Sequence, residues 1–188
     1  QPVMTFMDER TNITYYDSVF VPDSYLLGEV NAGSRVMGAS LEIEHGGSWS
    51  HSQWRMLAEA EKYCRATPGS AAALIDDPIV AARLLKVRAN TMVSELLQWR
   101  SVWASMNKQP NLGYGSMCKM FSSEAFRGDS IELMDICAPA SLLDKEGPAA
   151  YINLSYRHSQ GTTVYGGTSE IHRSVIAERA LGLPRTRA

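Results

Sequence analysis

DPIVAARLLKVRANTMVSELLQWRSVWASM, residues 77–106, has the pattern of one long helix. Asp77 is a suitable N-cap, and Pro78 suits the first helical position because its missing N–H would have no partner there. Apolar or small residues then recur at spacings of four and three, in a stripe made of Leu85, Ala89, Met92, Leu96, Trp99, Trp103 and Met106. Such a stripe is typical of a seam buried against other helices, so we predict a helical bundle.

Helical patterns continue on both sides of this segment. A first helix is expected from about residue 32 to residue 65, before the linker-like TPGS of residues 67–70. A third covers roughly residues 115–137, loops follow, and a shorter last helix begins after the GGTS of residues 166–169. The elements together predict an all-α fold, an antiparallel four-helix bundle.

The N-terminal residues have a different pattern. Residues 12–21, NITYYDSVFV, are rich in β-branched and aromatic residues and end at the PDS of residues 22–24. This composition predicts a strand followed by a turn. One or two strands are marginal on their own, so we interpret residues 1–28 as a short β remnant and linker at the end of a β domain. Residues 29–188 are then the helical bundle domain.

Composition excludes several classes of function. The chain of 188 residues has a net charge of -2 and a pI of about 6.1, which argues against a nucleic-acid partner. No apolar run approaches about 18 residues, so we expect no membrane span. The three cysteines, Cys64, Cys118 and Cys137, are odd in number and form no CxxC pair. We interpret them as reduced thiols of a cytoplasmic protein, without a disulfide framework or a metal site.

The tail contains the most specific motif. YGGTSEIHR at residues 165–173 is followed by IAER at 176–179 and LGLPR at 181–185. Adjacent glycines allow a flat ligand to approach the backbone closely. Thr168 or Ser169 can cap the next helix, whose positive N-terminal end favours a phosphate-bearing ligand.

This tail resembles the C-terminal signature of the acyl-CoA dehydrogenases, and the resemblance extends over nearly all of the chain. Residues 19–22 and 27–33 are similar to the family's passage from its β domain into its C-terminal helical domain, and residues 76–80 and 156–157 also fit. The resemblance implies the C-terminal part of a longer FAD enzyme. Such enzymes desaturate acyl-CoA thioesters between the α and β carbons.

The resemblance also implies where the catalytic base lies. Most members place a carboxylate directly after the tail tyrosine, but that position here is Gly166, which cannot be a base. A minority place a glutamate on the first long helix of this domain, and LEIEH at residues 41–45 puts Glu44 at that position. Glu42 is expected to point elsewhere around the helix. Two glycines follow Glu44, and their cost in a helix suggests that a ligand or another helix approaches closely.

The remaining site residues follow from the same resemblance. Tyr165, Gly166 and Gly167 would line the thioester end of the acyl-CoA substrate. Thr168, Ser169 and Glu170 would contact the flavin. The family often carries Arg-x-x-Phe-Gly after the first helix, which contacts the ADP half of the flavin across a subunit interface. Only Arg65 of that motif is present here, in RATPG.

The implied partners are FAD, acyl-CoA, electron-transfer flavoprotein as acceptor, and further subunits in a homo- or hetero-oligomer formed through the bundle. The location would be the bacterial cytoplasm, or the mitochondrial matrix in a eukaryote. Residues 135–139, DICAP, lack the glycines of a second family turn. This departure and the shortened arginine motif are compatible with heteromeric sterol-side-chain dehydrogenases, in which one subunit type loses flavin contacts.

Two alternatives remain. The chain could be a non-catalytic subunit that keeps the bundle only for assembly. It could also belong to an acyl-CoA oxidase, although oxidases usually carry an extra helical domain. Because most of the family's β domain lies outside residues 1–188, we expect this part alone to be inactive and to bind no FAD tightly. Its apolar helix faces predict that it forms oligomers. The four histidines show no paired metal-ligand spacing and are expected to be structural or exposed.

Overall fold

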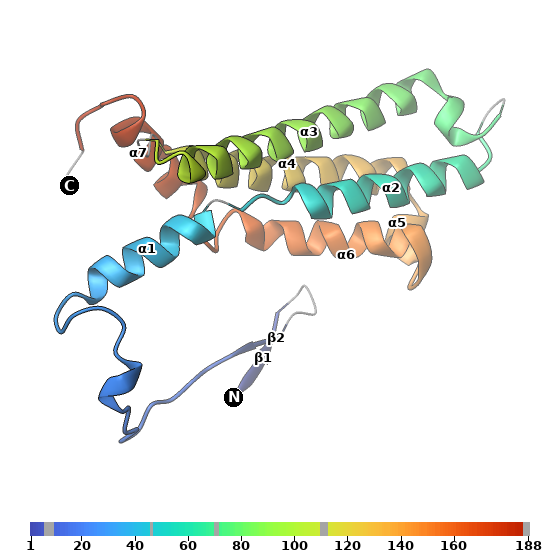
Figure 1. Ribbon diagram of the computed structural model, residues 1–188. Coiled ribbons are helices and arrows are strands. Elements are labelled where there is room, and N and C mark those ends of the chain that lie inside the picture. The colour runs from blue at the N-terminus through green and yellow to red at the C-terminus, as the bar shows by residue number, and fades with distance from the viewer. Residues whose placement is uncertain (6–9, 46, 70–71, 110–112, 186–188) are drawn as a thin grey trace. The chain divides into compact units, whose positions relative to one another are not determined.

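The computed structural model of the chain describes residues 1–5, 10–45, 47–69, 72–109 and 113–185 (Figure 1). These residues form two compact units, Gln1–Glu44 and His45–Ala188. The division falls in the last turn of a helix, and the predicted boundary between residues 1–28 and 29–188 stays a prediction. Each unit is described by itself.

The first unit contains a two-stranded antiparallel sheet of β1 (Pro2–Met4) and β2 (Arg10–Asn12), with Val3 opposite Thr11. A 3-10 turn, η1 (Asp23–Tyr25), and the helix α1 (Gly33–His45) follow. The strand predicted over residues 12–21 is wrong beyond Asn12, because residues 13–22 are irregular. A β-prone composition forms a strand only where a neighbouring strand is available for hydrogen bonding, and β1 reaches no further.

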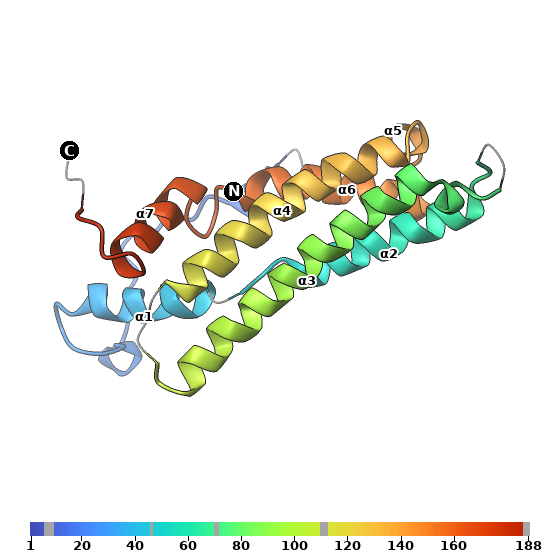
Figure 2. The ribbon, with the colours of Figure 1, turned by 90° about the horizontal axis from the view of Figure 1, so that it is seen from above.

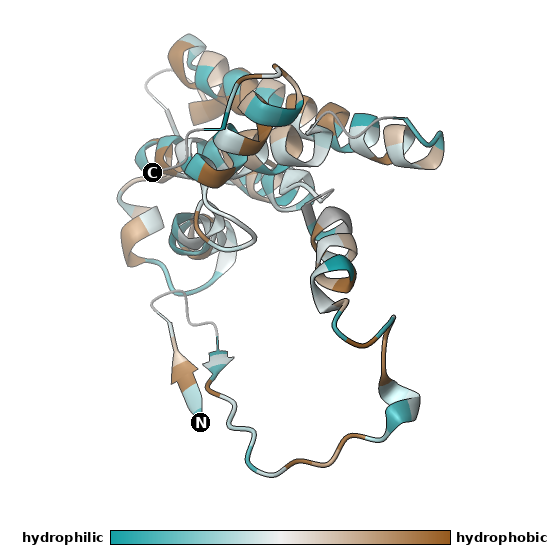
Figure 3. Cartoon of the chain, turned by 90° about the vertical axis from the view of Figure 1, so that its left-hand side faces the viewer, coloured by the Kyte–Doolittle hydropathy of each residue, from teal (hydrophilic) through white to brown (hydrophobic). Residues whose placement is uncertain are grey.

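The irregular segment between β2 and α1 carries apolar stretches, brown in Figure 3. The large exposed side chains there are Ile13, Tyr15, Tyr16, Val19, Phe20, Val21, Tyr25, Leu26, Leu27 and Val30. Apolar surface of this extent is usually covered by another part of a protein.

The second unit is built on four long helices, α2 (Ser50–Ala66), α3 (Pro78–Met106), α4 (Tyr114–Ile136) and α6 (Gly147–Thr162). The contacts run from α2 to α3, α3 to α4, α4 to α6 and α6 back to α2, which closes the four-helix bundle (Figures 1 and 2). The short helix α5 (Ala140–Leu143) precedes α6, and α7 (Ser169–Arg179) packs on α4. The predicted fold class is confirmed.

Two helix predictions were wrong. The expected continuous helix over residues 32–65 is interrupted, since α1 ends at His45 and α2 begins at Ser50. Polar groups in the break are bound by the bundle: the Cys118 thiol donates to the Gly47 carbonyl over 3.6 Å, and the Ser48 hydroxyl donates to Gln98 over 2.7 Å. Glycine is a poor helix former, so a break with such partners is favourable here.

The second wrong prediction is the loop expected after the third helix, where α6 forms instead. Pro148 occupies one of its first helical positions, which is a recognised start signal. Its buried face consists largely of small and hydroxyl residues: Ala149, Ile152, Ser155, Ser159 and Thr162. Such a face gives almost no hydrophobic periodicity in the sequence. The long helix predicted from Asp77 and Pro78 is confirmed, and the Asp77 carboxylate accepts from the Ile79 N–H at 2.8 Å.

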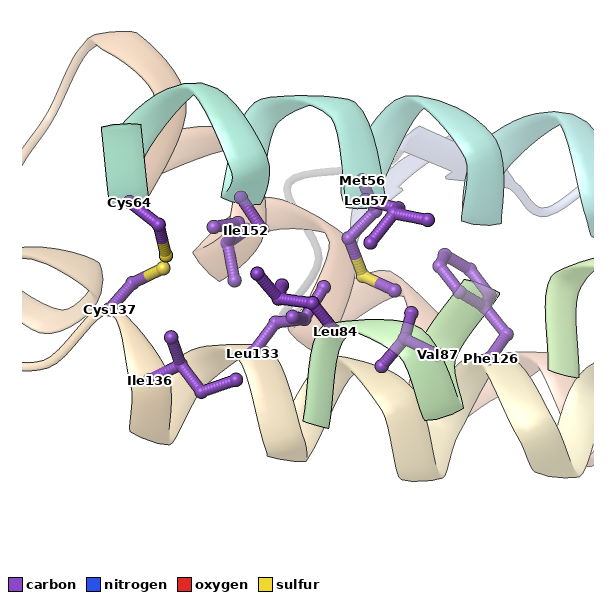
Figure 4. Packing of buried hydrophobic residues seen from close by; sticks show 11 residues of the cluster. Met56, Leu57, Cys64, Leu84, Val87, Phe126, Leu133, Ile136, Cys137 and Ile152 are labelled. Carbon is purple, nitrogen blue, oxygen red and sulfur yellow. The ribbon is translucent and has the colours of Figure 1, made fainter. Parts of the chain in front are cut away.

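The core lies between the four helices and is shown in Figure 4. It is formed by Met56, Leu57, Ala60, Cys64, Leu84, Val87, Phe126, Leu133, Ile136, Cys137 and Ile152. The predicted seam of α3 is not part of it. The large side chains of that stripe are exposed, from 50% at Met92 to 78% at Met106. Instead α3 buries Leu84, Val87, Thr91, Ser94 and Ala104. Thr91 and Ser94 satisfy their hydroxyls on the carbonyls of Val87 and Asn90, so the inner face accommodates polar side chains.

Candidate functional site

The glycine turn before α7 is held from the inside by two buried side chains. Gly166 and Gly167 both have positive φ, 66° and 91°. Lys119 of α4, only 6% exposed, donates from Nζ to the Gly167 carbonyl oxygen over 2.5 Å. The Nε2 atom of His172 lies 2.9 Å from the Gly166 carbonyl oxygen. Because a carbonyl can only accept, His172 carries its proton on Nε2.

Gly167 also has a steric reason to be glycine. A Cβ atom at this position would lie 2.8 Å from Nε2 of the fully buried His172. The turn therefore depends on a backbone without a side chain, packed against a buried ring. Since N–H and C=O point in opposite directions across a trans peptide, holding both carbonyls inward turns the N–H groups of Gly167 and Thr168 outward.

The predicted N-cap of α7 is confirmed at Thr168, whose hydroxyl accepts from the Ile171 N–H over 3.3 Å. Hydrogen bonds from the backbone N–H of Glu170 and from the Thr168 hydroxyl lower the pKa of the Glu170 carboxyl, as does the nearby Arg173. The start of α7 thus combines oriented N–H groups with two polar side chains and favours negative charge.

A pocket of about 490 Å³ opens between the start of α7 and α4. Thr168, Ser169 and Glu170 all line it, so the structure brings together three of the residues predicted to contact the flavin. Arg127 and Arg173 line the same pocket. The Ser169 hydroxyl is buried and has no hydrogen-bond partner among the described residues. A buried hydroxyl of this kind is free to bond to a ligand.

Tyr165, at the start of the turn, lies in an aromatic cluster. Its hydroxyl is 3.2 Å from Nε2 of His158, and its ring packs edge-on against Trp49 with centroids 5.8 Å apart. Trp49 also stacks on Phe126 at 6.1 Å and donates from its indole to Ser123 over 3.1 Å. The sequence analysis missed Trp49, His158 and Lys119, because they come from the start of α2, from α6 and from α4 and approach the turn only through the packing of these helices.

The other predicted site residues are not gathered at this turn within the second unit. Glu44 lies in the last turn of α1, in the first unit, and is exposed there. Arg65 lies in the last turn of α2, at the opposite end of the bundle from α7 (Figure 1). Arg65 lines a separate hollow of about 490 Å³ together with Glu61 and Lys62.

Within the described ranges, the side chains of His, Cys, Asp and Glu form no group of three or more that could hold a metal ion. None of the helices in the described part of the chain is both long enough and apolar enough to cross a membrane.

Comparison with known proteins identifies relatives with this architecture. Residues 31–181 match the family model of the acyl-CoA dehydrogenase C-terminal domain. The acyl-CoA dehydrogenase FadE26 of Mycobacterium tuberculosis is 29% identical, and the alignment covers 98% of this chain and 48% of FadE26. Short-chain specific acyl-CoA dehydrogenase from Bos taurus mitochondria is 28% identical, over 86% of this chain and 39% of the relative.

Solved structures agree with this assignment. A chain of the ChsE4-ChsE5 complex from Mycobacterium tuberculosis superimposes with a TM-score of 0.85 and 29% identity, covering 99% of this chain and 50% of that one. The Tcur3481-Tcur3483 steroid ACAD has a TM-score of 0.86 at 23% identity and shows the same fold. The chain spans about half the length of the relatives that it matches. It belongs to the acyl-CoA dehydrogenase family, and residues 31–181 correspond to the C-terminal domain of that family.

Proposed function

We propose that this chain is the C-terminal helical part of an FAD-dependent enzyme that desaturates an acyl-CoA thioester between its α and β carbons. The observation that carries the proposal is the turn at Gly166 and Gly167, which is held by Lys119 and His172 beside a polar pocket at the start of α7. Family membership supplies the reaction class.

The residues of the pocket fit an anionic flavin nucleotide. Ser169 offers a buried hydroxyl, and the N-terminus of α7 adds its oriented N–H groups. Arg127 and Arg173 offer positive charge beside the carboxylates of Glu124 and Glu170 in the same lining, and Arg173 is paired with Glu124. Thr168, Ser169 and Glu170 would hold the cofactor there. When bound, FAD supplies an acceptor for the hydride that leaves the β carbon.

The residues of this chain would handle the proton and the substrate. Gly166 carries no acid–base group, so we assign the removal of the α-proton to the carboxylate of Glu44. Tyr165, Gly166 and Gly167 would line the thioester end of the substrate, with the outward N–H groups of the turn available to a carbonyl oxygen. The contacts of Tyr165 with Trp49 and His158 support this role.

Assembly with other subunits is the second part of the proposal. Arg65 and the α7 pocket lie at opposite ends of the bundle, so Arg65 would reach the flavin bound by another subunit. The exposed apolar stripe of α3, with Trp99 and Trp103, supplies a surface for such contacts. Electron-transfer flavoprotein would be the acceptor, in the bacterial cytoplasm or the mitochondrial matrix.

A specific observation keeps a second function open. Gly166 replaces the usual base, and Arg65 stands without the Phe-Gly of its motif. The shortened arginine motif and the missing glycines of residues 135–139 leave a subunit of a heteromeric dehydrogenase open, in which one subunit type is non-catalytic. An acyl-CoA oxidase would share the chemistry of proton and hydride removal but pass electrons to oxygen.

Flavin content and bleaching separate these functions. The full-length protein is purified, its visible spectrum is recorded, and acyl-CoA is added without oxygen. The dehydrogenase is expected to be yellow and to lose its flavin absorbance with substrate. A colourless protein that acquires flavin only with a partner subunit supports the assembly role. Rapid acyl-CoA-dependent formation of hydrogen peroxide in air supports the oxidase. A stable, flavin-free homo-oligomer that binds no acyl-CoA contradicts the whole proposal.

A further inference from the structure

Two cysteines meet at one end of the bundle. Cys64 lies in the last turn of α2, and Cys137 follows the last residue of α4 as its C-cap. Both side chains are completely buried, and Figure 4 shows their sulfur atoms directed at one another between the two helices. Both thiols are free.

We propose that Cys64 and Cys137 form a redox modification site, at which hydrogen peroxide converts the two thiols into a disulfide that joins the C-terminal ends of α2 and α4. The third cysteine, Cys118, is also completely buried but lies on the first half of α4, where it donates to the Gly47 carbonyl. It therefore serves as an internal reference.

The pair has a defined order of reaction. The hydrogen bond from the Cys137 thiol lowers the pKa of Cys64, against burial and the nearby Glu61 carboxylate, which raise it. We therefore assign the first attack to Cys64. The hydrogen bond to Cys64 and burial raise the pKa of Cys137. Burial raises the pKa of Cys118 to about 12, so that this residue stays a thiol near neutral pH.

The reaction balances with hydrogen peroxide as the oxidant. The Cys64 thiolate attacks one peroxide oxygen, the O–O bond breaks, and the hydroxide that leaves takes up a proton as water. The sulfur of Cys137 then attacks the Cys64 sulfenic acid, the S–O bond breaks, and the Cys137 proton leaves with the hydroxyl group as a second water. Two thiols are oxidised by two electrons, and one peroxide is reduced to two waters.

The position of the two cysteines at helix ends determines how the oxidant reaches them and what the disulfide does. A terminal turn opens at a lower free energy than the middle of a helix, so a small oxidant can reach Cys64 without global unfolding. Arg65 is the next residue along α2 and is predicted to contact flavin. A disulfide would fix the turn that carries Arg65. This link to Arg65 rests on the proposed function, whereas formation of the disulfide does not.

The test is a thiol count on the 188-residue chain after mild treatment with hydrogen peroxide. Free thiols are alkylated under denaturing conditions, and the products are analysed by mass spectrometry. We expect two of the three thiols to become unreactive, a mass loss of two hydrogens, a peptide that links Cys64 to Cys137, and full reversal by dithiothreitol. The cross-link should raise the melting temperature by about 5 °C.

Two alanine variants show which cysteines are oxidised by hydrogen peroxide. Cys118→Ala should keep the mass loss and the shift in melting temperature, whereas Cys64→Ala should lose both. If Cys64→Ala does not fold, the linked peptide of the unmodified chain decides the question. The proposal is overturned if all three thiols remain reactive, if Cys118 is oxidised as readily as the pair, or if oxidation yields sulfinic acid or disulfide-linked dimers instead.

Discussion

The Nζ atom of Lys119 lies 2.5 Å from the carbonyl oxygen of Gly167, and the lysine side chain is only 6% exposed. An ammonium group is costly to bury, so this contact is informative about the turn that it holds. Replacing Lys119 with methionine keeps the length and apolar stem but removes the donor. We expect Lys119→Met to retain its helical content and to lose about 1–3 kcal/mol of unfolding free energy in urea titrations.

A turn-specific signal separates this role from general packing. In Lys119→Met the backbone amide resonances of Gly167 and Thr168 should shift, because the Gly167 carbonyl loses the hydrogen bond that orients this part of the turn. The control is Lys145→Met, at an exposed position between α5 and α6, which should leave stability and these resonances unchanged. Unchanged amide resonances in Lys119→Met would show that the lysine does not hold the turn.

Gly167 and Gly128 should respond to alanine in opposite directions. At Gly167, φ is 91° and the new Cβ would lie 2.8 Å from His172 Nε2, so Gly167→Ala should cost about 1–3 kcal/mol. Gly128 lies within α4, and a Cβ there meets nothing within 4 Å. Gly128→Ala should therefore stabilise the chain by about 0.5–1 kcal/mol. Thermal or urea denaturation of both variants checks the sign, and a neutral Gly167→Ala would contradict the packing argument.

Asp129 should make the stability of the bundle depend on pH. Its side chain is buried and accepts from Asn90 over 2.7 Å and from Gln53 over 3.4 Å. Burial raises the pKa of Asp129 to about 6, although these hydrogen bonds and Lys86 favour the charged form, while Glu132 opposes it. Because the pKa in the folded state exceeds that of the unfolded chain, the contribution is fully present below about pH 4 and is lost as pH rises through about 6.

The corresponding variant is Asp129→Asn, which stays neutral at all pH values. Wild-type chain is expected to lose about 2–3 kcal/mol of unfolding free energy from this group between about pH 4 and pH 7. The variant should lack that component. The Oε1 atom of Gln53 is buried and has no hydrogen-bond partner among the described residues. If the side-chain amide of Gln53 rotates by half a turn, Oε1 faces position 129 and accepts a hydrogen bond from a neutral side chain there. Identical pH profiles in urea titrations would rule out Asp129 as the titrating group.

The apolar stripe of α3 should control assembly. Trp99 and Trp103 are 65% and 58% exposed within the chain. If other subunits cover them, Trp99→Glu combined with Trp103→Glu should lower the oligomer mass in analytical ultracentrifugation and leave the helical content unchanged. Ile79→Glu is a matched control on the same helix outside the stripe, also exposed. A wild-type chain that is monomeric at micromolar concentration would contradict the assignment of the stripe to assembly.

Helix-capping residues in the sequence predicted this structure better than hydrophobic periodicity did. Asp77 with Pro78 and the cap at Thr168 depend on neighbouring residues, and both were located correctly. The stripe from Leu85 to Met106 was predicted to be buried in the bundle, but it is exposed within the chain. Periodicity identifies an apolar face of a helix but does not say whether the same chain covers that face. The helix α6 was missed because its inner face is rich in serine and threonine.

In the candidate site, too, residues that are neighbours in the sequence were predicted and residues brought in by tertiary packing were not. The turn residues 165–170 are contiguous in the sequence, and three of them line one pocket. Lys119 and Trp49 could not be found in this way, since an isolated lysine or tryptophan carries no motif and reaches the turn only through tertiary packing. Glu44 and Arg65 were inferred from the family resemblance, and their roles stay predictions.

The most specific prediction concerns Glu44. Gly166 offers no base, and Glu44 occupies the position at which one branch of the family keeps its carboxylate. Losing a general base typically slows a reaction by about 10²–10⁴-fold. In the full-length protein, Glu44→Gln should retain flavin and fold but bleach that much more slowly with acyl-CoA. Glu42→Gln, two positions earlier on the same helix, should bleach at the wild-type rate. Stopped-flow absorbance measures both. If Glu44→Gln bleaches as fast as wild type, another residue removes the proton; if the wild-type protein itself does not bleach, the non-catalytic assembly role is favoured.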